Sequence, residues 1–188
     1  MAAAQSGTIP KELKPYTSCH FPDELGVVRV DPLAPGVTAR TVGTAEGAKQ
    51  IDMEAGLRIM LSYPFTDFYA NVKAEKLPDG KYSTLKNDLL ANLRHVQATS
   101  PGTAMNTALP ANLHKFEVYG EDRDKLEGGV LGMYLFFDND AHIAATIYLL
   151  NQETYQRKFQ TIEEYRRLRD QFLENYTGCI RENQALYR

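Results

Sequence analysis

The chain has no tryptophan, only two cysteines and little excess of charge, and each scarcity excludes a class of protein. Its 21 basic and 24 acidic side chains give a formal net charge of −3, which argues against a dedicated binder of nucleic acid or anionic membranes. No apolar run approaches the ~20 residues that span a bilayer. Cys19 and Cys179 are too far apart in the sequence to form a zinc or redox motif.

The N-terminal residues and the cysteines both bear on the compartment. Met1–Gly7 (MAAAQSG) is similar to the small-residue end of a signal-peptide cleavage region. We therefore expect an exported, periplasmic or extracellular protein; the alternative is a flexible N-terminus on a cytoplasmic one. In an oxidising compartment Cys19 and Cys179 are candidates for a disulfide that closes a loop of about 160 residues. Two unrelated thiols are the alternative.

The most apolar stretch predicts the centre of the fold. Val130–Phe137 and His142–Leu150 have the composition of two strands, joined in a hairpin at Asp138–Ala141. Both faces of the first strand are apolar, which is typical of the middle of a sheet covered on both sides. We expect one face to carry Leu131, Met133, Leu135 and Phe137, and the other to carry Val130, Tyr134 and Phe136.

Two amphipathic segments predict helices. The first is expected to begin near Ser83, because leucines recur with helical spacing from Leu85 onward. The second has a capping box at Thr161 and Glu164 and is expected to end at Gly178. Its polar side is expected to carry Arg166, Arg167 and Arg169.

Together these elements predict an α+β fold, with a central antiparallel sheet of about six or seven strands sandwiched between two helices. Residues 37–188 are expected to form this single domain. Residues 1–36 are expected to form an extended Pro-rich arm that lies on it, because closely spaced prolines interrupt regular structure. The prolines are Pro10, Pro15, Pro22, Pro32 and Pro35.

The order of these elements is similar to that of the PsbP-like fold, the family of the extrinsic PsbP subunit of photosystem II and its non-photosynthetic relatives. The resemblance covers Ile51–Thr177 and rests on the segments FEVYG, GVLGMYLFF, IAATIYLLN and EEYRRLRDQFLENY. It implies a binding or assembly module rather than an enzyme. It carries no functional residue over to this chain. The Pro-rich arm and the Ala39–Met53 hairpin go beyond the family pattern.

Few residues are candidates for catalysis or metal binding. The histidines stand at no metal-ligand spacing, so we expect neither a metal site nor a cofactor. Asp138, Asn139 and Asp140 could ligate calcium, but these residue types are also the expected ones for a hairpin turn. Acid–base catalysis would need His142 together with carboxylates of the Glu121–Glu127 loop. Those carboxylates belong to Glu121, Asp122, Asp124 and Glu127.

A cluster of aromatic residues around Pro64 is the candidate binding site, because aromatic side chains are enriched at interfaces. The cluster consists of Tyr63, Phe65, Phe68 and Tyr69, and a minor core is its alternative. The sequence therefore predicts a non-enzymatic binding or assembly module for a protein or small ligand of unknown identity. The alternative is a small hydrolase that uses His142 and the Glu121–Glu127 loop.

Overall fold

The computed structural model describes residues 8–21, 26–36, 38–44, 47–62, 68–99, 103–104, 108–123, 126, 129–151 and 159–187. Within them the protein has an α+β fold built on an antiparallel sheet, which confirms the predicted class. In chain order the elements are η1 (Lys11–Tyr16), β1 (Gly26–Leu33), β2 (Thr38–Thr44), β3 (Gly47–Asp52), β4 (Ala55–Ser62), β5 (Phe68–Lys76), α1 (Asp79–Thr99), β6 (Thr103–Ala104), β7 (Glu117–Arg123), β8 (Val130–Asp138), β9 (Ile143–Asn151) and α2 (Ile162–Leu186).

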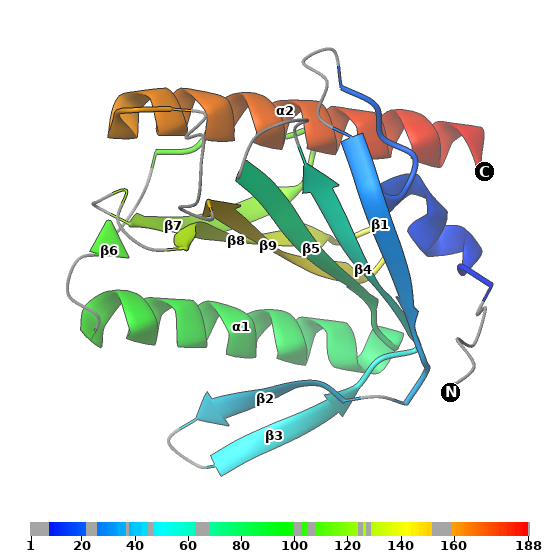
Figure 1. Ribbon diagram of the computed structural model, residues 1–188. Helices are drawn as coiled ribbons and strands as arrows, with labels where there is room; N and C mark the ends of the chain where they lie inside the picture. Colours follow the sequence, from blue (N-terminus) through cyan, green and yellow to red (C-terminus); the bar gives the residue numbers. More distant parts are fainter. Residues whose placement is uncertain are drawn as a thin grey trace, which may run out of the picture.

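The main sheet has seven strands in the order β1-β4-β5-β9-β8-β7-β6. All neighbouring strands in it are antiparallel. Strand β9 is therefore the central strand, and β2 and β3 pair with each other as a separate hairpin that lies near α1 (Figure 1).

The predicted central hairpin forms as β8 and β9. A β-bulge between Val130 and Gly132 shifts the pairing by one residue. As a result Leu131 packs in the same cluster as Tyr134, on the face opposite to Leu135. The prediction that Leu131 shares a face with Leu135 is wrong, because strict alternation of side chains does not continue across a bulge.

The two long helices lie on opposite sides of the sheet, α2 above it and α1 beneath it in Figure 1. The α2 side holds the larger cluster of buried side chains, which is rich in aromatic residues. The α1 side holds a smaller and mostly aliphatic cluster. The α1-side cluster contains Met53, Leu77, Tyr82, Leu85, Leu89, Leu90, Leu93, Leu135, Phe137 and Ala144.

The helix ends differ from the predicted ones in two places. Helix α1 begins at Asp79 rather than near Ser83, because the Pro78 carbonyl already accepts hydrogen bonds from the amides of Lys81 and Tyr82. Helix α2 begins with the predicted capping box at Thr161. It continues through Gly178, however, as far as Leu186.

Gly178 has a packing role instead of ending the helix. A Cβ atom at this position would lie 3.0 Å from Nε2 of His114. The glycine thus allows the His114 ring to rest against α2. A glycine in the sequence of a helix can mark a close approach as well as a helix end.

The segment from Leu13 to Phe21 and strand β1 are part of the fold. Leu13, Tyr16 and Phe21 are buried in the α2-side cluster, and β1 forms one edge of the sheet. Pro32 is tolerated in β1 because an edge strand has one row of backbone groups without a neighbouring strand. The prediction of an extended arm is therefore not confirmed.

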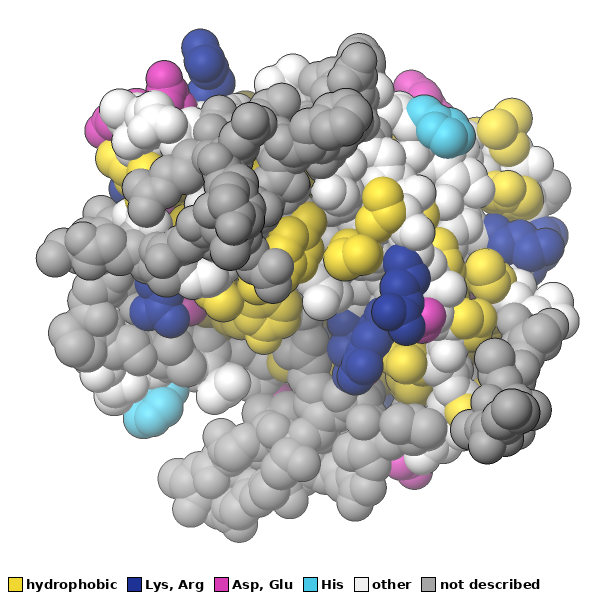
Figure 2. Space-filling view, viewed as in Figure 1, with side chains coloured by type: hydrophobic (Ala, Val, Ile, Leu, Met, Phe, Trp, Pro, Cys, Tyr) yellow, Lys and Arg dark blue, Asp and Glu magenta, His cyan; other side chains and the backbone are white. Residues whose placement is uncertain are grey.

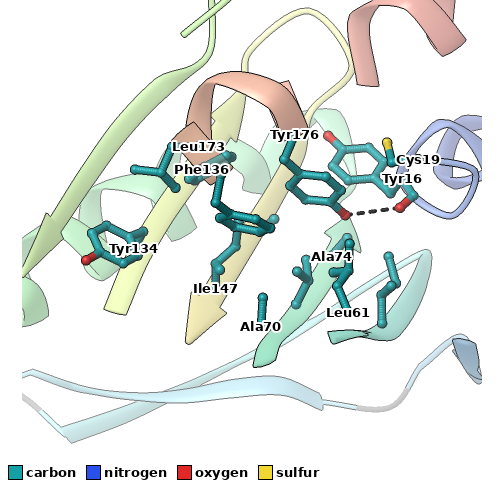
Figure 3. Packing of buried hydrophobic residues seen from close by; sticks show 14 of the residues in the cluster. Tyr16, Cys19, Leu61, Ala70, Ala74, Tyr134, Phe136, Ile147, Leu173 and Tyr176 are labelled. Carbon is teal, nitrogen blue, oxygen red and sulfur yellow. Dashed lines mark hydrogen bonds between the residues drawn. The ribbon is translucent and has the colours of Figure 1, made fainter. Parts of the chain in front are cut away.

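The N-terminal segment is fixed to α2 by polar and covalent links. The Tyr176 hydroxyl donates a hydrogen bond of 3.0 Å to the Tyr16 carbonyl (Figure 3). Cys19 and Cys179, the two predicted disulfide candidates, are joined by a disulfide with a Cα–Cα distance of 5.8 Å. These links hold η1 against the C-terminal half of the helix.

Candidate functional site

Of the four aromatic residues predicted as a binding cluster, the two that the structure describes lie on opposite faces of the sheet. Tyr63 and Phe65 lie outside the described residues. Phe68 is fully buried on the α2 side, with its ring 5.7 Å from that of Phe159 in an edge-to-face contact. Tyr69 follows it in the same strand, so its half-buried side chain points to the α1 side.

His142 lies in the turn between β8 and β9, where it has a φ of 51°. Its Nδ1 atom is 2.6 Å from Oδ1 of Asp79, and its ring stacks on Tyr82 at 5.0 Å. The hydrogen bond with His142 lowers the pKa of the Asp79 carboxyl. These contacts hold the unusual backbone conformation of the turn.

The residues of the hydrolase alternative lie at opposite ends of the sheet. Glu121 is paired with Met133, whereas Asp138, the last residue of β8, pairs with the neighbour of His142. Met133 and Asp138 are five positions apart on β8, which is roughly 17 Å along a strand. Asp124 and Glu127 lie outside the described residues. The structure therefore does not bring His142 and Glu121 together.

Polar side chains near the β8–β9 turn form hydrogen bonds with one another. Asn139 accepts hydrogen bonds from Tyr82 at 3.0 Å and from Lys86 at 3.1 Å, and it donates one to Glu117 at 2.9 Å. Lys86 also forms an ion pair with Glu117. The hydrogen bond from Lys86 is the main cause that lowers the pKa of Glu117. This network holds the turn against α1.

A cavity of about 320 Å³ lies on the other side of the same turn, between η1 and the end of α2. Its lining includes Asp138, whose carboxylate is fully buried. That carboxylate accepts hydrogen bonds from Arg181 at 2.9 Å and from Gln184 at 2.7 Å. The Asp138 carboxylate thus already has hydrogen-bond partners within the protein and is not available to a ligand. The remaining lining residues are Lys11, Glu12, Pro15, Asp140, Ala141 and Tyr187, with Arg181 and Gln184.

A second buried carboxylate, that of Asp122, lies under α2 and pairs with Arg169. Arg169 was predicted on the polar side of the helix, but only 2% of it is exposed. The Tyr134 and Tyr165 hydroxyls, 2.8 Å apart, also donate to Asp122. Burial raises the pKa of both tyrosines, so both hydroxyls stay protonated.

The sequence contains a signal for this buried arginine. Arg169 lies four residues after Tyr165 and three before Phe172, both of which are buried. This spacing places all three on one face of a helix. An arginine within an apolar stripe is therefore a candidate for a buried ion pair.

The α1 side of the sheet carries a cross-strand row that α1 leaves partly uncovered. The row consists of Arg29, Met60, Asn71, Tyr148, Met133 and Glu121, on β1, β4, β5, β9, β8 and β7 respectively. We call it the α1-side row. On the central strand Ala144 and Thr146 are buried, whereas Tyr148 is 38% exposed. Among the described residues, helix α1 therefore covers one end of this face and leaves Tyr148 at the other end exposed.

The open end of this face combines apolar and charged groups. Met60 and Met133 are half-buried on either side of Tyr148 in the row. Figure 2 shows hydrophobic side chains gathered in the middle of the view, beside a group of Lys and Arg side chains. Near β7 the face borders a hollow of about 400 Å³ whose lining includes Tyr119 and Leu93. The sequence did not reveal this surface, since its members come from six strands.

Comparison with known protein families, curated proteins and solved structures gives no match for this chain. Among the described residues, no group of three or more His, Cys, Asp or Glu side chains could hold a metal ion. No helix in the described part of the chain is long and apolar enough to cross a membrane. The α1-side row is the candidate functional site.

Proposed function

We propose that the protein is a non-enzymatic binding module whose ligand lies on the α1-side row. The observation that carries this proposal is the exposure of Tyr148, an aromatic residue on the central strand of the sheet. Tyrosine supplies a large contact area at a small cost in side-chain entropy. The resemblance to the PsbP-like fold agrees with a binding role.

The arrangement of charged groups favours binding over catalysis. Asp138 is held by Arg181, and Glu117 is held by Lys86. A general base needs an available lone pair within reach of a substrate proton. These carboxylates instead serve the packing of the turn and of α2.

We further propose that the protein is exported, which the buried Cys19–Cys179 disulfide supports. Intact mass of the protein from its native source, alkylated with and without reductant, tests this. We expect a shortened N-terminus and two cysteines that alkylate only after reduction. An unprocessed chain with two free thiols would contradict export.

A neutral apolar dye, N-phenyl-1-naphthylamine, tests the binding role. We expect saturable binding near one dye per chain, measured by fluorescence titration. Tyr148→Lys should weaken dye binding by about ten- to a hundredfold, because it removes an apolar contact worth about 1.5–3 kcal/mol. Leu186→Lys is the matched control, since Leu186 is more exposed but lies at the end of α2. Equal dye binding by wild type and Tyr148→Lys would contradict the proposal.

A further inference from the structure

Two incompletely paired side chains, Arg58 and Glu121, flank the α1-side row: Arg58 lies beside its β4 member, and Glu121 is its β7 end. Arg58 lies on β4 two residues before Met60, so both side chains are on the α1 side, and Arg58 is opposite Lys73 in the register next to the row. Its cross-strand neighbour Asp31 is paired with Arg29 at 2.7 Å. Within the described part of the chain, the Arg58 side chain has no hydrogen bond or ion pair. Arg58 is therefore available to an anion.

Glu121 ends the row on β7 and is only 7% exposed. Its Oε2 atom is buried and has no hydrogen-bond partner among the described residues. Burial raises the pKa of this carboxyl, which Arg123 only partly offsets. A buried acceptor without a donor costs free energy, and a ligand that brings a donor would recover it.

The floor between these two groups is apolar. Met60, Tyr148 and Met133 lie along it, with the exposed side chain of Asn71 between the first two. From β4 to β7 the row crosses four inter-strand spacings, roughly 19 Å in all. An elongated apolar chain laid across the strands would cover the exposed face of Tyr148.

We propose that the α1-side row binds an amphiphile with an anionic group at one end and a hydrogen-bond donor at the other. The anion pairs with Arg58, the chain lies on Met60, Tyr148 and Met133, and the donor reaches Oε2 of Glu121. This inference rests on the proposed binding function and adds the chemical class of the ligand. The different groups at the two ends of the ligand fix the direction in which the chain lies.

Titration calorimetry with two fatty acids tests this on the wild-type protein. The probes are 12-hydroxydodecanoic acid, which has both end groups, and dodecanoic acid, which lacks the donor. We expect the hydroxylated acid to bind about tenfold more tightly, since it supplies the donor that Oε2 of Glu121 lacks. Equal affinities, or tighter binding of dodecanoic acid, would overturn the proposal.

Two substitutions assign the two ends. Glu121→Met should abolish the preference between the two acids, because it removes the acceptor. Arg58→Met should weaken both acids about tenfold and leave their ratio unchanged. If Arg58→Met leaves both affinities unchanged, the anion does not bind there and the proposal fails.

The two proposals fail in different ways. Binding of N-phenyl-1-naphthylamine that depends on Tyr148, with no preference between the acids, would uphold the binding face and overturn its ligand class. No saturable binding of the dye or of either acid would overturn both. Thermal unfolding of each variant confirms that the sheet is intact.

Discussion

Glu121 and Asp122 are consecutive carboxylates on β7, and the two faces of the sheet treat them differently. Asp122 points under α2, where Arg169 and two tyrosine hydroxyls engage it. Glu121 points to the α1 side, where its Oε2 atom has no partner among the described residues. A carboxylate whose hydrogen bonds are complete stabilises a fold, whereas an incomplete one is available to a ligand.

The same contrast extends to the packing on each side. The α2 side is closed by aromatic residues from the helix and the sheet. Among the described residues, α1 and Met53 cover part of the α1 side, and Tyr148 remains exposed. One face of the sheet therefore serves stability, and the other keeps a surface that solvent can reach.

The largest expected change in stability comes from breaking the hydrogen-bond network around Asp122. Arg169→Met should destabilise the protein by about 3–5 kcal/mol, because it leaves the buried Asp122 carboxylate with only the more exposed Arg166, at 3.6 Å, as a cation. Denaturant unfolding measures this. The double variant Arg169→Met/Asp122→Asn should recover part of the loss, since it removes the stranded charge as well. A loss below about 1 kcal/mol for Arg169→Met would contradict the role of this pair.

A smaller loss of stability is expected when an added side-chain atom crowds the network around Asp122. An added Cβ at Gly132 would meet the hydroxyls of Tyr134 and Tyr165. Gly132→Ala should therefore cost about 1–3 kcal/mol by overpacking. Gly129→Ala is the matched control, because a Cβ there would meet no atom within 4 Å. Equal melting temperatures for the two variants would show that the tyrosines move aside freely.

The smallest expected change in stability comes from Glu121, and it depends on pH. Burial raises its pKa, so the folded state favours the neutral acid and loses stability as pH rises above the ordinary value of 4.5. Glu121→Gln removes this loss. We expect the stability of the variant to rise relative to that of the wild type as pH rises through the raised pKa. Unfolding curves between pH 4 and pH 8 measure the difference, and one that stays constant would contradict the raised pKa.

Local patterns in the sequence predicted the elements that depend on neighbouring residues. The β8–β9 hairpin and the Thr161 capping box both follow from short-range signals. The bulge after Val130 was not predictable in this way, because alternation looks the same until the partner strand fixes the register.

Local patterns in the sequence could not predict the α1-side row, and the reason is different. The α1-side row joins residues as distant as Arg29 and Tyr148, and only the strand order brings them into line. Glu121 and Asp122 look alike in the sequence. Their environments differ because α2 supplies Arg169 to one of them and α1 supplies no such cation to the other.

The Cys19–Cys179 disulfide also decides how the molecule would carry a mechanical load. The two cysteines are 160 residues apart and enclose the main sheet, including β1 and β6 at its edges. A pulling force applied to the two ends of the chain would pass from residue 19 to residue 179 through the sulfur atoms. The sheet, its hairpins and the α1-side row lie inside this covalent ring and would bear none of the tension.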